Sequence, residues 1–430
     1  MGHMKLRPAL VAVVAALVAG CGSGTSSQST APSEAEHTQR SSASASPVTG
    51  SSGPSISVES TVPPSPSPTG LGIAWRETGS FGTTINRVAD VTRGPMGLVA
   101  VGTRYDPTAW DVFGPRPPHA GGVWLSADGS SWEAIEAPDV FADATLSIVF
   151  STTDSSIIAI GTIGDGMQHE IDGTPFAPHA AWESPDGRNW HRVASGFPVG
   201  LRVSKVVQGE RGYLALVHDD HGTSTDDELW FSSDGRRWEL VQVEDGAEQS
   251  VSDVAAGDEG FVAIGTIITA GETGDLVAFA SADGREWIAS APLSGMHYVA
   301  GVGPDWFGMS TALPVEGPEP GTGTLLFSAN GLDWSDVGEL RLGVSGQCRE
   351  SASSLSGAGE WLFMHTGLNY PCSEGAVQTA GNQYVSADGV TWEALPFPYN
   401  SSHRIIEVDG TLIGAGHTGN RATFWIGDPQ

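Results

Sequence analysis

The sequence predicts an all-β protein built from seven repeated units, each of four antiparallel strands, because two short patterns recur along it. One pattern is Ser-x-Asp/Asn-Gly-x-x-Trp, found six times, and the other is a short apolar strand, found seven times and mostly led by glycine. A period near fifty residues is typical of repeat architectures in which each unit is one small sheet. The closing tryptophans, spaced 47 to 58 residues apart, are Trp132, Trp190, Trp238, Trp287, Trp334 and Trp392.

Each copy of the first pattern, called the box below, predicts a turn between two strands. Asp-Gly between apolar runs favours a hairpin turn whose two central residues have positive φ, which glycine adopts freely and aspartate or asparagine tolerates. The serine hydroxyl and the carboxylate can hydrogen-bond to the turn backbone. Burying the closing indole removes about 150–250 Å² from water, worth roughly 4–6 kcal/mol. The box is therefore interpreted as structural, and its turn residues are Asp128, Asp186, Asp234, Asp283, Asn330 and Asp388.

The box resembles the Asp box (BNR repeat) of sialidases and related β-propellers, Ser-x-Asp-x-Gly-x-Thr-Trp. It departs by one residue, because glycine follows the aspartate or asparagine directly in all six copies. In that family the box is a structural turn on the face away from the active site. The resemblance therefore implies a propeller fold more directly than it implies an activity.

The seventh unit is incomplete at the C-terminus, and the N-terminus supplies what it lacks. Residues 421–427 predict a third strand, after which the chain stops at Gln430. Residues 74–77 match the pattern of a fourth strand, and Trp75 precedes Trp132 by about one repeat. The sequence thus predicts a seven-bladed β-propeller of four-stranded antiparallel blades, closed by an N-terminal strand near Trp75. Closure removes the exposed sheet edges that promote aggregation.

The N-terminus predicts export and a lipid anchor. Lys5 and Arg7 precede an apolar run, 9–19, that is too short to span a bilayer and fits a signal peptide. Val-Ala-Gly-Cys ending at Cys21 resembles the lipobox of bacterial lipoproteins, which implies cleavage before Cys21 and its lipidation; an ordinary secretory signal is the alternative. We expect a signal peptide at 1–20, the lipidated Cys21 with a flexible tether at 21–70, and the propeller at 71–430. The expected location is the outer face of the bacterial cell membrane or envelope.

Charge and cysteine content narrow the partners. The net charge of −30, with two lysines, disfavours nucleic acid as a partner and is compatible with a cationic one. Cys348 and Cys372 are predicted to form a disulfide, because exported proteins favour pairing; two free thiols are the alternative. The disulfide would close about 24 residues and contribute roughly 3 kcal/mol. We expect a monomer that contacts the membrane through Cys21.

One face of the predicted ring carries the long connections between second and third strands. Variable loops on a rigid scaffold are where function usually resides. We therefore expect an unknown protein or glycan ligand on this long-loop face. The long connections are 104–120, 163–178, 218–228, 312–322 and 367–382.

Three arginines are candidate ligand-binding residues. Arg87, Arg202 and Arg404 stand four residues before valines of three first strands, and Tyr298 has that place in the fifth unit. We expect them to share one register and to ring the mouth of the central channel, where guanidinium groups suit a carboxylate or phosphate. Sialidases use an arginine triad, so the resemblance implies a carboxylate-bearing sugar. The alternative is that these arginines pair with acids of the chain itself.

No residue spacing identifies a catalytic acid, base or nucleophile. The His-Asp-Asp-His run at 218–221 and the acids at 226–228 lack a tight metal spacing, so we predict a solvated acidic loop, no metal and no cofactor, with calcium left open. The sequence likewise shows no tight metal spacing at His119, His179, His365 and His417, so we predict no metal at these histidines. The first hypothesis is a non-enzymatic, lipid-anchored binding scaffold at the cell envelope. The alternative is a sialidase-like exo-glycosidase.

Overall fold

The structure is a computed structural model that describes the chain from residue 71 to residue 429 with internal gaps. The described ranges are 71–82, 85–105, 119–136, 139–164, 179–198, 200–219, 227–243, 248–269, 272–312, 322–341, 344–345, 348–369, 380–397 and 401–429. The predicted signal peptide, Cys21, the tether and Cys372 lie outside them. Within these ranges no helix has the length and apolar character needed to span a membrane.

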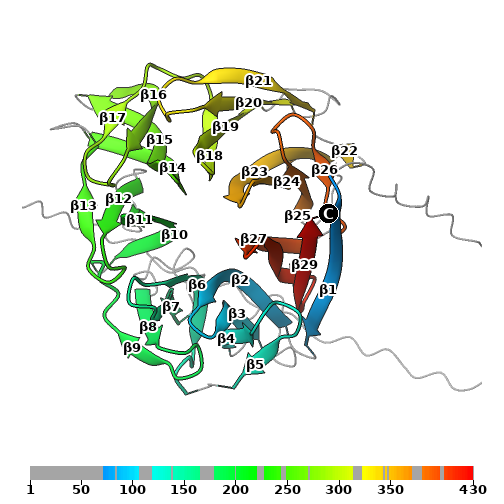
Figure 1. Ribbon diagram of the computed structural model, residues 1–430. Helices are drawn as coiled ribbons and strands as arrows, with labels where there is room; N and C mark the ends of the chain where they lie inside the picture. Colours follow the sequence, from blue (N-terminus) through cyan, green and yellow to red (C-terminus); the bar gives the residue numbers. More distant parts are fainter. Residues whose placement is uncertain are drawn as a thin grey trace, which may run out of the picture. The chain divides into compact units, whose positions relative to one another are not determined.

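The described residues form seven antiparallel sheets arranged as the blades of a β-propeller, as predicted (Figure 1). The innermost strands surround the central channel, and in blades one to six the order of the strands follows the chain outward. Blades one to three are β2 (Ile85–Gly94), β3 (Gly97–Tyr105), β4 (His119–Ser126) and β5 (Glu133–Ile135); β6 (Ala144–Ser151), β7 (Ile157–Ile163), β8 (His179–Ser184) and β9 (His191–Val193); and β10 (Leu201–Gly209), β11 (Gly212–Asp219), β12 (Asp227–Ser232) and β13 (Glu239–Val241).

The remaining blades repeat this order, and the sixth carries one additional two-residue strand, β22, beside its innermost strand. Blades four to six are β14 (Glu248–Gly257), β15 (Gly260–Thr269), β16 (Glu272–Ser281) and β17 (Ile288–Ala289); β18 (Met296–Val302), β19 (Asp305–Ala312), β20 (Thr322–Ser328) and β21 (Ser335–Arg341); and β22 (Val344–Ser345), β23 (Cys348–Ala358), β24 (Trp361–Asn369), β25 (Ala380–Ser386) and β26 (Glu393–Ala394). Blade seven is β27 (Ser401–Val408), β28 (Thr411–Thr418), β29 (Arg421–Pro429) and, from the N-terminal side, β1 (Ile73–Phe81).

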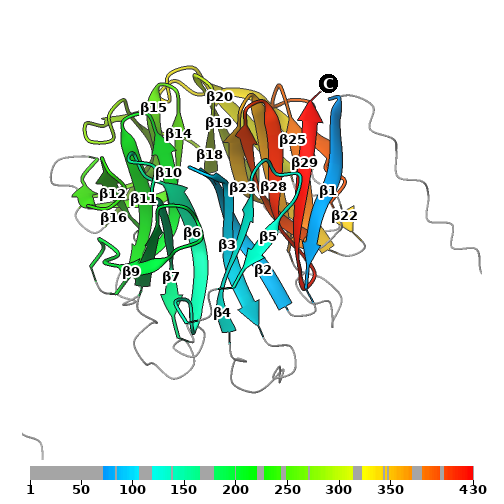
Figure 2. The same cartoon turned by 60° about the horizontal axis from the view of Figure 1, so that its bottom comes forward.

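The predicted ring closure is confirmed. β1 pairs antiparallel with β29 over nearly its whole length, with Trp75 opposite Gly427 and Phe81 opposite Ala422. Figure 2 shows β1 beside β29, with the C-terminus at the end of the ring where β1 begins. The indole of Trp75 meets Phe397 edge-on at 5.1 Å between ring centroids. The last blade is thus completed by a strand from the other end of the chain.

The boxes form turns held by their own side chains. In the second box, Ser184 Oγ accepts the N–H of Gly187 at 2.8 Å, and Asp186 Oδ1 accepts the N–H groups of Arg188 and Asn189 at 2.9 and 2.8 Å. The indole N–H of Trp190 donates to the carbonyl of Gly187 at 2.7 Å. Only the glycine has positive φ, so the expectation that both central residues do is wrong. The carboxylate accepts the N–H groups that follow it, which holds the aspartate at negative φ.

The boxes also join neighbouring blades. A Cβ on Gly187 would lie 2.9 Å from a methyl group of Leu125 in the preceding blade, so glycine is needed for close approach as well as for φ. The residue after this glycine is an arginine in three boxes. Arg188 donates to Glu133 at 3.2 Å, and Arg285 lies 4.3 Å over the ring of Phe231. The box is therefore an interblade contact, in agreement with its structural interpretation.

The two ends of the channel differ. One, the box face, carries the boxes and the short hairpins between first and second strands. The other, the long-loop face, is where the second strands end and the third strands begin. β1 starts at the box face, where the N–H of Leu71 donates to Glu393 Oε1 at 3.1 Å. The chain therefore enters the propeller on the face opposite the long connections.

Candidate functional site

A β-bulge at one repeated place sets which residues project around the channel. Six of the seven innermost strands shift register by one residue at this point, and β27 runs without a shift. A β-bulge inserts one residue that has no partner on the neighbouring strand, and it redirects the side chains that follow. The residue directly after the bulge, together with its equivalent in β27, defines what we call the channel register: Asp90, Ile148, Lys205, Asp253, Tyr298, Ser354 and Arg404.

The three candidate arginines do not share one register, so that expectation is wrong. Arg87 lies opposite Thr103 and Arg202 opposite His218, which are equivalent places near the long-loop face, and both arginines are exposed. Arg404 lies opposite Ala415, in the channel register, as does Tyr298. The reason is that Val408 belongs to the hairpin itself, whereas Val91 and Val206 lie three residues before their hairpins. Arg87 and Arg202 therefore lie two ladder pairs from the channel register that holds Arg404 and Tyr298.

A charged pair links the third and fourth blades in the channel register. Lys205 Nζ lies 2.7 Å from Asp253 Oδ1, and the lysine side chain is 25% exposed against 10% for the aspartate. The same carboxylate accepts two backbone N–H groups, from Val254 at 2.9 Å and from Val299 of the fifth blade at 3.0 Å. Asp253 therefore holds three blades together, and sequence reasoning missed it.

A second pair repeats this arrangement between the seventh and first blades. Arg404 Nε lies 3.7 Å from Asp90 Oδ1. Asp90 accepts the N–H of Val91 and, across the blade junction, the N–H of Val149, both at 2.9 Å. Burial raises the pKa of Asp90, while the charge of Arg404 and the two N–H groups oppose the rise. Counting four residues back from each hairpin would have aligned Arg404 with Asp90 in the sequence.

The tyrosine of the channel register is poorly suited to act as a nucleophile. Burial, assisted by the charge of Asp253, raises the pKa of Tyr298 above its usual value, which favours the protonated phenol. A phenolate nucleophile needs the opposite shift. The geometry thus offers a polar channel whose cations are matched by acids of the chain itself. That channel holds a cavity of about 250 Å³.

Buried histidines gather on the sixth and seventh blades. Burial lowers the pKa of His403 to about 3, and it also lowers the pKa of His417, with the nearby Arg87 adding to the effect. Burial likewise lowers the pKa of His179 to about 4. These side chains are neutral at pH 7. Within the described ranges no three histidine, cysteine or acidic residues lie close enough to hold a metal ion.

The predicted acidic loop is described only at its edges. His218 Nδ1 and Asp227 Oδ1 are in contact across β11 and β12, and Trp230 donates its indole N–H to Glu228 at 2.9 Å. Residues 220–226 between them lie outside the described ranges. The acids at the loop edges are therefore engaged by neighbouring side chains.

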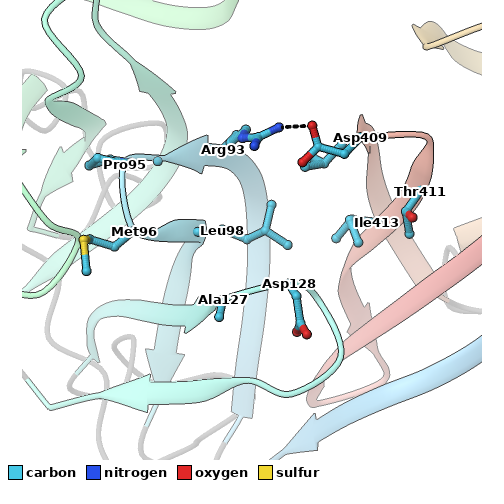
Figure 3. A pocket seen from close by; sticks show the side chains of 12 residues that line it. Arg93, Pro95, Met96, Leu98, Ala127, Asp128, Asp409, Thr411 and Ile413 are labelled. Atoms are coloured by element: carbon cyan, nitrogen blue, oxygen red, sulfur yellow. Dashed lines mark hydrogen bonds and ion pairs between the residues drawn. The ribbon is translucent and has the colours of Figure 1, made fainter.

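A cavity of about 370 Å³ lies on the box face between the first and seventh blades. The guanidinium of Arg93 and the carboxylate of Asp409, 2.7 Å apart, meet across it, and Leu98 and Ile413 form its apolar floor with Asp128 of the first box beside them (Figure 3). The side chains of both Arg93 and Asp409 are solvent-exposed. This cavity lies beside turns that have structural roles.

Comparisons with known proteins identify no family. No family model and no curated protein matches the chain. Among solved structures, Ycf48 bound to a D1 peptide is 13% identical, with a TM-score of 0.44 over 84% of this chain and 96% of that one. The β-propeller domain of the trilobed protease from Pyrococcus furiosus is 10% identical, with a TM-score of 0.45 over 81% and 95%. A PL25 ulvan lyase bound to a GlcA(1-4)Rha3S unit is 11% identical, with a TM-score of 0.45 over 82% and 96%.

Proposed function

We propose that the protein is an exported, lipid-anchored binding scaffold of the bacterial cell envelope, and that it engages its ligand without chemical turnover on the long-loop face. The observation that carries this is the pairing of the channel cations. Lys205 and Arg404 are matched by Asp253 and Asp90, and each aspartate also bonds the backbone of the next blade. Lys205 and the two aspartates are committed to joining blades and serve stability, which favours the long-loop face as the place for recognition of the proposed ligand.

The anchor and the binding face are compatible in this proposal. Cys21, released as the first residue of the mature chain, carries the lipid, and residues 22–70 form the tether. Leu71 lies at the box face, so the tether joins the propeller away from the long-loop face. Arg87 and Arg202, both exposed near the long-loop face, are the residues nearest to the expected ligand.

Site-specific photocrosslinking in cells tests the binding face. A benzophenone amino acid is placed at Arg87, at Arg202 or, as a matched control on the box face, at the exposed Arg93. We expect one crosslinked species from Arg87 and Arg202 and none from Arg93. Equal crosslinking from all three positions would contradict the proposed face. In the same cells Cys21→Ser should move the protein from the membrane fraction to the soluble fraction.

A sialidase-like exo-glycosidase is the second candidate. One observation favours it: Arg87 and Arg202 share a register at the mouth of the channel, where they could hold a carboxylate-bearing sugar. Turnover of a fluorogenic sialoside by the wild type, lost in Arg87→Ala and Arg202→Ala variants that still fold, would establish this activity. An absence of turnover in the folded wild type would leave the binding scaffold.

A further inference from the structure

The two channel aspartates mark a repeated way of bridging blades. Each carboxylate accepts one N–H from its own strand and one from the next blade: Asp90 from Val91 and Val149, and Asp253 from Val254 and Val299. Each of the four donor residues comes directly after a residue of the channel register in the sequence. In an antiparallel ladder residues alternate between hydrogen-bonded and non-hydrogen-bonded pairs. Counted from the short hairpins, these donors fall in non-hydrogen-bonded pairs, so their N–H groups point off the free strand edge into the channel.

The junction between the sixth and seventh blades has the same two donors and lacks the carboxylate. The equivalent residues are Leu355, opposite Met364, and Ile405, opposite Gly414. Both ladders begin at two-residue hairpins, at 358–361 and 408–411. Hydrogen-bonded and non-hydrogen-bonded pairs therefore alternate in the same order as at the two junctions that have an aspartate. The place of the aspartate is taken by Ser354, which carries a hydroxyl group where aspartate carries a carboxylate. Within the described ranges neither N–H has a side-chain acceptor.

A cavity of about 180 Å³ lies at this junction, and its lining includes Ser354, Ile405 and Arg404. Leu355 lines the neighbouring channel cavity of about 250 Å³, and Arg404 belongs to the lining of both, so an occupant that meets both N–H groups lies where the two cavities adjoin. Arg404 is 39% exposed, and its contact with Asp90, through Nε at 3.7 Å, leaves most of its donors uncommitted to that carboxylate. The cavity is smaller than the pockets that enclose drug-sized ligands, which limits an occupant to a few heavy atoms. It therefore combines room for a small molecule with a fixed positive charge.

Two buried side chains of the cavity wall carry polar atoms without partners among the described residues. Gln383, 8% exposed, donates its amide N–H to the carbonyl of His403 at 2.7 Å, and its Oε1 has no donor. His403, 6% exposed, contacts Thr423 Oγ1 through Nε2 at 2.8 Å, and its Nδ1 has no partner. A buried polar atom left without a hydrogen bond costs about 1–3 kcal/mol, so such atoms call for an explanation.

We propose that this cavity is a binding site for a small hydroxycarboxylate, whose carboxylate takes the place of the missing aspartate. Its two oxygens accept the N–H groups of Leu355 and Ile405, beside the positive charge of Arg404. Its hydroxyl group donates to Oε1 of Gln383, an atom that is covered in this structure and becomes reachable on rotation of the Gln383 side chain. A carboxylate fits because the same pair of backbone donors holds a carboxylate at the two equivalent junctions. The site lies inside the ring, away from the long-loop face, so it goes beyond the proposed function and its test does not depend on it.

Calorimetric titration of the full-length protein in detergent tests the ligand class with a matched pair of probes. Glycerate and glycerol differ only in the carboxylate. We expect saturable binding of glycerate, binding of glycerol at least tenfold weaker, and at least tenfold weaker glycerate binding by Arg404→Gln. Tighter binding of inorganic phosphate than of glycerate would overturn the carboxylate assignment, and equal binding of glycerate and glycerol would do the same.

Ser354→Asp tests the proposed site from within the protein and does not require the natural ligand. This substitution supplies the carboxylate found at the equivalent junctions, so we expect a higher melting temperature in the absence of ligand and at least tenfold weaker glycerate binding. Ser354→Asn, of nearly the same shape and without charge, controls for steric blocking. It should weaken binding without the rise in melting temperature. An unchanged or lower melting temperature for Ser354→Asp, together with no glycerate binding by the wild type, would reject the site.

Discussion

Trp75 lies against Gly427, where the first described strand closes the ring on the last. A Cβ on Gly427 would approach the indole atoms of Trp75 to 2.9 Å, closer than packed carbon atoms come. We therefore expect Gly427→Ala to lower the free energy of unfolding by about 1–3 kcal/mol through overpacking. Gly338→Ala is the matched control, because a Cβ there meets nothing within 4 Å. Urea denaturation of both variants measures the difference, and equal stability of the two would show that the closure tolerates displacement.

Removing the closing strand altogether has a larger expected effect. Deletion of residues 1–80 leaves β29 with an unpaired edge, and exposed edges template aggregation. We expect this variant to elute in the void volume in size-exclusion chromatography, whereas a control deletion of residues 1–60 keeps β1 and elutes as a monomer. A soluble, equally stable 1–80 deletion would mean that the ring holds without the N-terminal strand.

The fold could be predicted because its determinants are local and periodic. Each box contains its own turn, glycine contact and tryptophan, so six copies fix the repeat length without knowledge of distant contacts. Trp75 could be assigned to the last blade since it matched the pattern of the fourth strands. The turn geometry was predicted less well, because the Asp-Gly pair suggests a two-residue hairpin while the carboxylate of Asp186 in fact accepts the following N–H groups.

The buried charge pair in the channel should matter far more than an exposed one. Asp253→Ala removes the partner of Lys205 and the acceptor of two backbone N–H groups, so we expect a loss of about 3–5 kcal/mol in the free energy of unfolding. Arg93→Ala breaks the ion pair with Asp409, in which both side chains are exposed, and should leave stability unchanged within error. Urea denaturation of the two variants compares them, and a small effect of Asp253→Ala would remove the structural role given to the channel charges.

The candidate site could be predicted only in part, because the alignment of its strands depends on where each hairpin closes. Val408 belongs to the hairpin pair whereas Val91 lies three residues before one, so matching these valines aligned Arg404 with Arg87 when it belongs with Asp90. The pairing of Lys205 with Asp253 joins residues 48 apart in different blades, and no local pattern predicts which acid a lysine meets across a blade junction. Gln383 likewise donates to a carbonyl of the next blade, that of His403, and no local pattern predicts this contact.

Stability should fall as the pH drops from about 6.5 towards 4. Burial lowers the pKa of folded His403 to about 3 and that of His179 to about 4, whereas an unfolded histidine titrates near 6.5. Below pH 6.5 the unfolded chain therefore binds protons that the folded chain does not, which favours unfolding. The stabilisation is fully present above pH 6.5, and each histidine costs about 1.4 kcal/mol per pH unit below it.

Urea denaturation between pH 7 and pH 4 measures this slope. His403→Gln removes one of the histidines with a lowered pKa, so its stability should decline less steeply with falling pH than that of the wild type. His191→Gln, at an exposed position, is the control and should retain the full slope. A slope unchanged by His403→Gln would show that other groups govern the acid sensitivity.

A disulfide between Cys348 and Cys372 would tie the innermost strand of the sixth blade to the connection after β24. Cys348 is the first residue of β23, while Cys372 lies outside the described ranges. For a closed loop of about 24 residues we expect the bond to contribute roughly 3 kcal/mol, and Cys348→Ser and Cys372→Ser to lose the same amount singly and together. Mass spectrometry of a non-reduced digest of the exported protein detects the linked peptides. Finding both thiols alkylated without prior reduction would instead show two free cysteines, and the serine variants should then match the wild type in urea.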